Sequence, residues 1–456
     1  AFAGDRPDVA SRISGLGSVS ANLEGALRMS DKALVLSGDV DTDAGDVDLD
    51  VRGFWKDARN MSAKGRVSAS DVDLAKILGD QRLGQVALDL DADVTVSGGD
   101  LSGQMMAEIP FIDFKGNRIE NIHAEGNKDG NVISGKISVD DGIASLDAVA
   151  SCVLAGERSQ WRLDADIEEF HPDALGLVPA LGLSRVGGKI HADIAGNSPD
   201  NITGGIAADD ISFSSTRGDL SVRHLNVSGS MDSSGFRHYM VDSDFCNAEV
   251  RSDASVSEDV EVVRTLLAHV FPDDFAFPRQ TDTSLAGQDF SLTLTLHPVE
   301  DLYVFLESPL RPLTPVILTA GYDAVSGVLS ANLIAPYLLQ GKNKLLKSLA
   351  FDASVSETTG MQGSASLNMP VKNDRADISV SMSGRGDSMD LGLGWKGEKN
   401  SGNFGKVNMR ASMIQDAFSG ERGTRIDILE SAFRLSGEEW TVSPATLSYI
   451  GKRADI

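Results

Sequence analysis

Strict alternation of apolar and polar side chains is the feature that most constrains how this chain can fold. The longest run covers residues 85–96, and its apolar members are Val86, Leu88, Leu90, Ala92, Val94 and Val96. Successive side chains of a β-strand point to opposite faces, so a period of two predicts strands with one dry face and one wet face. The pattern returns in two later runs, at Phe290, Leu292, Leu294 and Leu296 and at Met389, Leu391, Leu393 and Trp395.

Turn sequences separate the alternating runs. Glycine or small polar residues cluster at 97–100, 128–131, 140–142 and 233–235. Such clusters favour tight hairpin turns, and antiparallel hairpins can keep one face solvated. Two longer segments, 109–139 and 211–250, share an order of strand, strand, glycine turn and strand, which is typical of solenoid-like arrays.

Helical periodicity is confined to four short segments, near residues 70–79, 171–183, 256–271 and 298–306. In the third segment, Ser255 and Glu258 form a capping box. In the first, Ser70 is the expected cap and Gly79 the stop. We expect these helices to be insertions in one continuous β fragment over residues 1–456. Their apolar stripes would pack on the apolar face of the sheet or at its open end.

The charge balance excludes one class of partner. With 41 basic and 67 acidic residues the net charge is −26. Polyanion binding normally needs a basic surface, so we expect no nucleic acid. No apolar run reaches the roughly 18 residues of a membrane-spanning helix. Both ends of the sequence stop inside strand-like patterns, so we expect a fragment of a longer protein whose anchor or export signal lies outside it.

The candidate catalytic and metal-binding motifs each lack a required element. The aspartate string at 39–50 has Ala44 where a calcium loop needs Gly, and Asp50 where it needs Glu. The GxGxxG sequence at 392–397 lies in an alternating run rather than between a strand and a helix. Two cysteines are too few for a metal site, and the sequence leaves two thiols and one disulfide open. We expect no catalytic residue, no metal and no cofactor.

The many alternating apolar side chains need a dry environment. Either two sheets pack face to face, or one sheet curls lengthwise so that its inner face forms a trough. The second arrangement gives an apolar groove that could hold acyl chains, because each CH₂ group removed from water contributes about 0.8 kcal/mol. The candidate lipid-groove residues are Val86, Leu88, Leu90, Val94, Val96, Phe290, Leu292, Leu294, Leu296, Met389, Leu391 and Leu393.

Several strand patterns resemble those of the TamB family (translocation and assembly module, inner-membrane component), particularly its Bacteroidota members. They are a glycine-flanked strand at 187–196 with 201–204, the segment 206–213, the Ser-Asp-Phe strand at 241–250, the segment 391–395 followed by Gly402, and the segment 439–444. The resemblance covers most of the chain.

The resemblance implies an all-β fold, an elongated antiparallel β-taco with an apolar groove and a few short helices. It implies a non-catalytic, bridge-like lipid transfer scaffold that carries phospholipid between two membranes and is linked to outer-membrane protein assembly. The chain would then be the periplasmic part of an inner-membrane-anchored protein in a Gram-negative bacterium. Its partners would be phospholipid, an Omp85-type outer-membrane barrel, and membranes reached through termini outside this sequence.

Two other functions compete with the lipid groove. One is a surface β-solenoid with a closed dry core and a structural or adhesive role. The other is a chaperone for outer-membrane proteins that pairs open sheet edges with client strands. An enzyme is the class that the sequence supports least.

Overall fold

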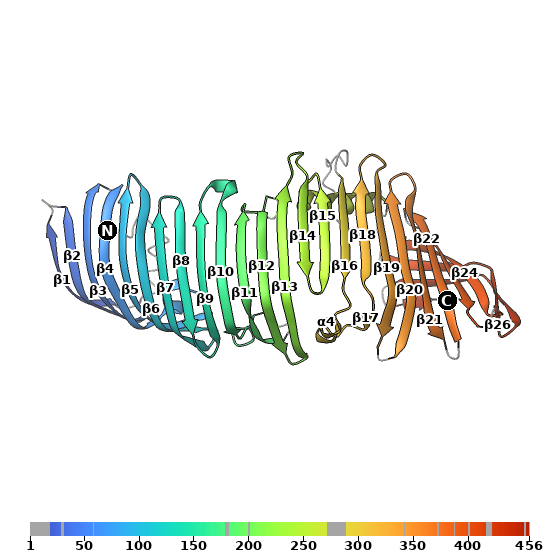
Figure 1. The fold of residues 1–456 in the computed structure, drawn as a ribbon, viewed down its shortest axis with the longest axis horizontal. Helices are drawn as coiled ribbons and strands as arrows, with labels where there is room; N and C mark the ends of the chain where they lie inside the picture. Colours follow the sequence, from blue (N-terminus) through green and yellow to red (C-terminus); the bar gives the residue numbers. More distant parts are fainter. Residues whose placement is uncertain are drawn as a thin grey trace. The chain divides into compact units, whose positions relative to one another are not determined.

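The computed structural model describes residues 19–28, 32–57, 59–177, 182–198, 201–270, 289–341, 343–371, 374–386, 388–399, 402–415, 422–450 and 453–455. These residues form antiparallel strands with a few short helices, which confirms the predicted all-β curled sheet. The chain divides into two compact units, Ala1–Leu225 and Asn226–Ile456. Within each unit, strands that follow one another in the sequence lie mostly side by side (Figure 1). Strand β13 (Gly218–Met231) crosses this boundary. The continuity of one sheet over residues 1–456 stays a prediction.

Consecutive strands of the first unit pair antiparallel from β1 to β12. They are β1 (Val19–Arg28), β2 (Ala33–Thr42), β3 (Gly45–Asp57), β4 (Asn60–Asp73), β5 (Leu83–Ser97), β6 (Asp100–Phe114), β7 (Asn117–Asp129), β8 (Val132–Asp140), β9 (Ala144–Val153), β10 (Gln160–Phe170), β11 (Leu183–Ala195) and β12 (Thr203–Ser215). Two short helices, α2 (Leu74–Leu78) and η1 (Gly156–Arg158), lie in the connections.

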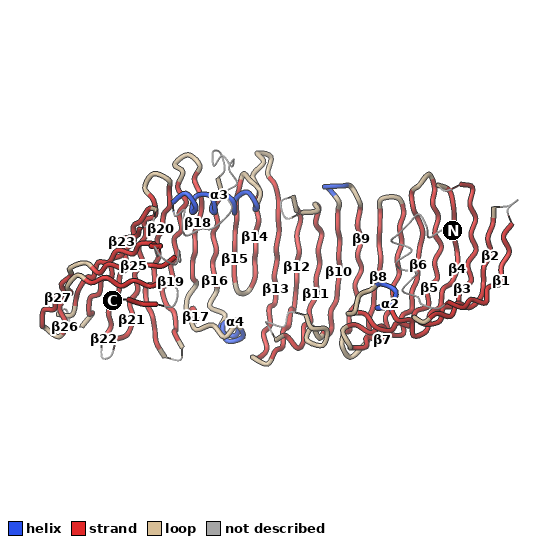
Figure 2. Tube along the Cα trace, turned by 180° about the vertical axis from the view of Figure 1, so that it is seen from behind, coloured by secondary structure: helices blue, strands red, loops and turns tan. Residues whose placement is uncertain are grey.

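A line of irregularities crosses the strands of the first unit. The pairing register shifts between Ala69 and Val72 in β4, and the next strand pair shifts beside it, within residues 83–89 of β5. Similar shifts occur at 167–170 in β10 and at 187–189 in β11. Bulges bend a strand and increase its twist, so a row of them folds the sheet along one line. Figure 2 shows strand segments that turn across the lower part of β1–β7.

The register of the first unit places the apolar side chains in rows that run across the strands. One row consists of Leu36, Val51, Gly65, Ala92, Met105, Gly126, Gly135, Ala150, Leu163, Ala192 and Ile206, each paired with the next. Every member is apolar or glycine. The alternation seen in single strands therefore adds up to one apolar face, which we call the inner face.

The second unit is a further antiparallel sheet. Its strands are β14 (Arg237–Ser243), β15 (Cys246–Ser252), β16 (Phe290–Leu296), β17 (Leu310–Pro312), β18 (Val316–Asp323), β19 (Val328–Gln340), β20 (Lys344–Ser356), β21 (Gly360–Val371), β22 (Asp374–Arg385), β23 (Ser388–Gly397), β24 (Phe404–Gln415), β25 (Arg422–Ile428), β26 (Ser431–Leu435), β27 (Glu438–Val442), β28 (Ala445–Ile450) and β29 (Arg453–Asp455). Most consecutive strands in this order pair with each other. Four pairs join strands that are not consecutive: β16 with β18, β17 with β19, β24 with β26, and β25 with β28.

An apolar row also crosses the second unit. It consists of Val241, Ala248, Leu294, Leu318, Leu333, Phe351, Ala365, Val380, Leu393 and Val407. At one end of these strands, helix α3 (Val256–Val270) packs Val262 and Leu266 against Tyr322 and Val355. At the other end, Val316 and Ala335 form a second buried cluster with Leu338 and Leu346.

Three of the four expected helices are present. α2 lies within 70–79, but Asp73 caps it instead of Ser70, because the Asp73 carboxylate accepts the backbone N–H of Lys76 while Ser70 belongs to β4. α3 covers all of 256–271 except residue 271, which is outside the described residues. α4 (Glu300–Phe305) lies within 298–306.

The helix expected at 171–183 is wrong for its described part. Residues 172–176 form turns, in which Gly176 has a positive φ of 62°. Pro172 lacks an N–H and Gly176 favours the left-handed region, so the apolar periodicity does not produce a helix here. Residues 178–181 lie outside the described residues. The aspartate string at 39–50 forms the β2–β3 hairpin, and residues 392–397 lie in β23.

Candidate functional site

An open apolar hollow lies on the inner face of the first unit. Its volume is about 860 Å³, and it spans strands β5 to β12. The inner-face residues that line it are Val94, Leu101, Gly103, Met105, Gly126, Lys128, Ile133, Gly135, Ala150, Cys152, Trp161, Leu163, Ala192, Ile194 and Ile206. Nearly all of them are apolar or glycine, which is the composition expected of a site for hydrocarbon.

Large apolar side chains around this hollow remain exposed to solvent. The exposed fraction is 46% for Leu101, 50% for Met105 and 45% for Trp161. Clusters of this kind mark binding surfaces, since a monomeric soluble protein rarely exposes a contiguous apolar patch. The inner face is therefore an accessible groove in this unit rather than a closed core.

Glycines give the groove its depth. Gly103, Gly126 and Gly135 sit at inner-face positions of three consecutive strands. A side chain at Gly126 would press on Met105, whose Cε atom would lie 3.0 Å from the new Cβ. The floor between the larger side chains is thus backbone, which leaves room for a guest molecule.

The predicted groove residues of the first unit separate into two groups. Val94 lines the hollow. Leu88, Leu90 and Val96 lie half-buried in inner-face rows beside it, and Val86 is almost fully buried near the line of bulges. Val86 therefore contributes to the fold of the sheet rather than to an accessible surface.

The predicted groove residues of the second unit are divided by the two buried clusters. Phe290 and Met389 pack against the cluster under α3, and Leu296 packs against the cluster of Val316 and Ala335. Leu292, Leu294 and Leu391 lie half-buried between the two clusters, and Leu393 is 37% exposed.

Most residues that line the hollow were not among the groove residues predicted from the sequence. Gly103, Gly126 and Gly135 carry no hydrophobic signal, and β8 and β9 alternate over too few large side chains to stand out. Their shared face becomes visible only through the cross-strand register. Pairing register is weakly specified in glycine-rich strands such as these, so the shared face is hard to recognise strand by strand.

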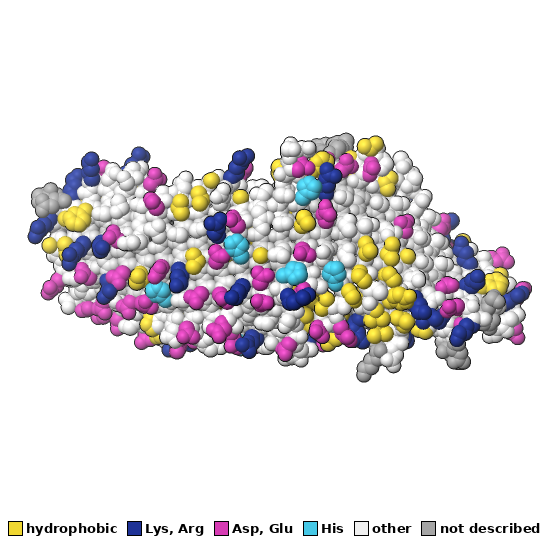
Figure 3. All heavy atoms as spheres, in the orientation of Figure 1, with side chains coloured by type: hydrophobic (Ala, Val, Ile, Leu, Met, Phe, Trp, Pro, Cys, Tyr) yellow, Lys and Arg dark blue, Asp and Glu magenta, His cyan; other side chains and the backbone are white. Residues whose placement is uncertain are grey.

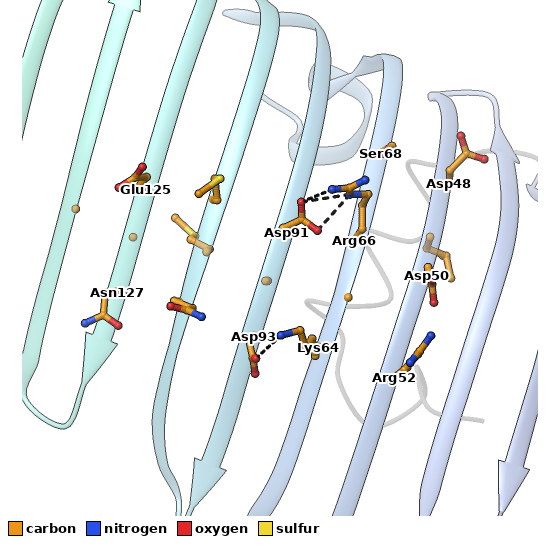
Figure 4. Close-up of a pocket in the computed structure, with 18 of the residues that line it drawn as sticks. Asp48, Asp50, Arg52, Lys64, Arg66, Ser68, Asp91, Asp93, Glu125 and Asn127 are labelled. Carbon is orange, nitrogen blue, oxygen red and sulfur yellow. Dashed lines mark hydrogen bonds and ion pairs between the residues drawn. The ribbon is translucent and has the colours of Figure 1, made fainter.

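The opposite face of the first unit is polar. It holds a second hollow of about 1040 Å³, where Arg66 pairs with Asp91 at 2.7 Å and Lys64 with Asp93 at 3.0 Å (Figure 4). The Arg66 guanidinium holds the pKa of Asp91 below its usual range. Figure 3 shows Asp, Glu, Lys and Arg side chains intermixed over this face. Exposed pairs of this kind contribute little stability and neutralise one another, so the face is a solvated exterior.

A buried carboxylate, that of Asp259, lies in the first turn of α3 in the second unit. Ser252 donates a hydrogen bond to Asp259 with an O···O distance of 2.9 Å. Burial raises the pKa of Asp259 to about 6, and the negative charges of Asp253 and Glu258 act in the same direction. The predicted capping box is present beside it, because Ser255 and Glu258 exchange two backbone-to-side-chain hydrogen bonds.

The described part of the chain offers little to other classes of site. Among the described residues, no group of three or more His, Cys, Asp or Glu could hold a metal ion. None of the described helices is long and apolar enough to cross a membrane. Cys152 and Cys246 are both free thiols.

Comparison with known proteins gives no further guide to the site. No protein family, no curated protein and no solved structure matches this chain.

Proposed function

We propose that this chain is a non-catalytic lipid transport scaffold whose inner face carries the acyl chains of phospholipids. The observation that carries the proposal is the open apolar groove across β5–β12, with Leu101, Met105 and Trp161 close to half exposed. An uncovered apolar face of this kind is costly in water, and a hydrocarbon guest removes that cost.

The energetics favour a guest held without specific contacts. Each CH₂ group that leaves water contributes about 0.8 kcal/mol, so even a partly enclosed acyl chain is held by several kcal/mol. Rows of similar apolar side chains continue from strand to strand, so neighbouring positions bind a chain about equally well. Such a surface permits a lipid to move across the sheet from one strand to the next.

The resemblance to the TamB family supplies the biological setting of the proposal. In that setting the chain is the periplasmic part of an inner-membrane-anchored protein of a Gram-negative bacterium. It would conduct phospholipid toward an Omp85-type outer-membrane barrel and serve outer-membrane biogenesis, including protein assembly and secretion.

The exposure of the groove bears on the alternative functions. A structural or adhesive β-solenoid needs a closed dry core, and half-exposed Met105 and Trp161 are unfavourable in such a core. A chaperone for outer-membrane proteins would bind client strands at sheet edges through backbone hydrogen bonds, with no use for an apolar groove.

Lipid extraction and mass spectrometry of the purified chain test the proposal. Met105 and Met106 form a matched pair, because they are adjacent, 50% and 48% exposed, and lie on opposite faces of β6. Met105→Glu places a carboxylate in the groove, whereas Met106→Glu places it on the polar face. We expect co-purified phospholipid in the native chain, about a tenfold loss in Met105→Glu and little change in Met106→Glu.

Circular dichroism of both variants controls for folding. Absence of lipid from the native chain, together with failure to take up added phospholipid, would contradict the proposal. Equal loss in the two folded variants would show that lipid does not occupy the inner face. Crosslinking of the inner face to peptide instead of lipid would favour the chaperone.

A further inference from the structure

One charged residue interrupts the inner face of the first unit. Lys128 lies on the same face of β7 as Ala124 and Gly126, because alternate residues of a strand share a face. It pairs with Gly103 of β6 and Ile133 of β8. It therefore belongs to the row that contains Val94, Gly103, Ile133, Cys152, Trp161, Ile194 and Gly204. Lys128 also lines the apolar hollow.

No second charged residue occupies the described inner-face positions of β2–β12 between the bulges and the turns. Between the line of bulges and the hairpin turns, the described inner-face positions of β2–β12 are otherwise occupied by apolar residues, glycine and one threonine. The Lys128 ammonium donates a hydrogen bond to the carbonyl oxygen of Gly130 at 2.5 Å. Among the described residues it forms no ion pair, in contrast to Lys64 and Arg66 on the polar face.

The position of Lys128 along the strand fits an amphiphile. It is the last inner-face residue before the β7–β8 turn, so its ammonium group lies at the rim of the groove. It lies six positions along β7 from the buried Ile122, a span of about 20 Å at about 3.3 Å per residue. One leaflet of a bilayer holds its acyl chains within about 15 Å, half of a hydrocarbon core about 30 Å thick. An acyl chain laid along the strands thus fits between the rim and the buried end.

We propose that Lys128 binds the phosphate of the lipid headgroup at the rim while the acyl chains lie in the groove below it. This inference rests on the proposed function and adds a headgroup subsite to it. The lysine ammonium is a compact cation that pairs with phosphate as a point charge. The methylene groups of the same side chain can stay in contact with the apolar surface. Because the rest of the face is uncharged, the single cation orients an anionic headgroup toward the rim.

Binding of two matched fluorescent lipids to the full chain tests the assignment. The first probe is pyrene-labelled phosphatidylglycerol, and the second is diacylglycerol with the same acyl chains and no phosphate. The variants are Lys128→Gln, Lys128→Arg and Lys136→Gln, the last on the polar face of the neighbouring strand β8. Ala150→Trp, which fills the hollow, is a fourth variant.

We expect Lys128→Gln to bind phosphatidylglycerol about tenfold more weakly, since a charge-assisted hydrogen bond is lost. Its binding of diacylglycerol should not change. Lys128→Arg should retain binding, Lys136→Gln should match the native chain, and Ala150→Trp should bind both probes poorly.

The outcomes separate this inference from the function on which it rests. If the native chain binds neither probe, the proposed function fails. If it binds both and Lys128→Gln weakens neither or both equally, the lipid groove stands and the headgroup subsite is wrong. If Lys136→Gln has the same effect as Lys128→Gln, the preference is one of overall charge and the subsite is again wrong.

Discussion

At the scale of single residues, side-chain size on the inner face is set by how closely neighbouring backbones approach. Gly65 in β4 lies where an added Cβ would overlap the carbonyl oxygen of Asp50 and lie 2.8 Å from the Cα of Val51. Gly53 in the adjacent β3 has more room, with its nearest atom 3.7 Å away. The sequence marks both positions only as glycine, so it could not show which of the two is sterically required.

This difference predicts opposite responses to the same substitution. Gly65→Ala should lower the free energy of unfolding by about 1–3 kcal/mol, because the backbone must shift to admit the methyl group. Gly53→Ala should be neutral or stabilising by up to about 1 kcal/mol, since alanine costs less conformational entropy than glycine. Urea unfolding of both variants measures the contrast. Equal stabilities would contradict the close approach at Gly65.

A second residue-scale prediction concerns Asp259. Its folded-state pKa of about 6 lies above the ordinary value of 3.8, so the folded chain holds this proton more tightly than the unfolded chain. Its contribution to stability is therefore unfavourable near neutral pH, improves as the pH falls through about 6, and levels off below about 4.

Asp259→Asn should remove that contribution. We expect the variant to melt above the native chain at pH 7.5 and the gap to shrink as the pH approaches 5, measured by thermal unfolding of both chains. Taking the difference between the two chains cancels the titration of the other carboxylates. A gap that stays constant with pH, or widens on acidification, would contradict the raised pKa of Asp259.

At the scale of elements, the alternation predicted where strands run and which face is dry, because both depend on local periodicity. It did not predict the line of bulges. A bulge depends on backbone conformations such as the positive φ of Asp71 (54°) and Asp210 (51°). The sequence around these two residues is equally compatible with a regular strand. The expected trough was right, whereas the position of its fold line required the register of neighbouring strands.

Helix α3 is the element whose packing is most readily tested. Leu266 is 1% exposed and contacts the cluster of Tyr322 and Val355, whereas Val260 on the same helix is 51% exposed. Leu266→Ala should destabilise the second unit by about 2–5 kcal/mol, the usual cost of a cavity at a buried leucine. Val260→Ala should change stability by less than about 0.5 kcal/mol. Chemical denaturation compares the two, and similar small losses would show that α3 does not pack on the sheet.

At the scale of the whole molecule, the inner face of each unit is formed by rows of side chains that no single strand reveals. Of the groove residues that the sequence predicted, Val94 lines the apolar hollow and Leu393 is 37% exposed. That they contact lipid stays a prediction. Val86 is buried near the bulges, and Phe290, Leu296 and Met389 pack partly buried against the two clusters of the second unit. A covered apolar face and an open one produce the same two-residue period in the sequence. Only the elements that pack over the face in the structure distinguish the two.

Site-specific photocrosslinking tests the central claim most directly. A photoreactive amino acid at Ile206 lies on the inner face, 41% exposed, and one at Val149 lies on the polar face, 50% exposed. After illumination of the chain with bound phospholipid, we expect lipid adducts at position 206 and essentially none at 149. Equal labelling at the two positions, or labelling at 149 alone, would contradict a lipid groove on the inner face.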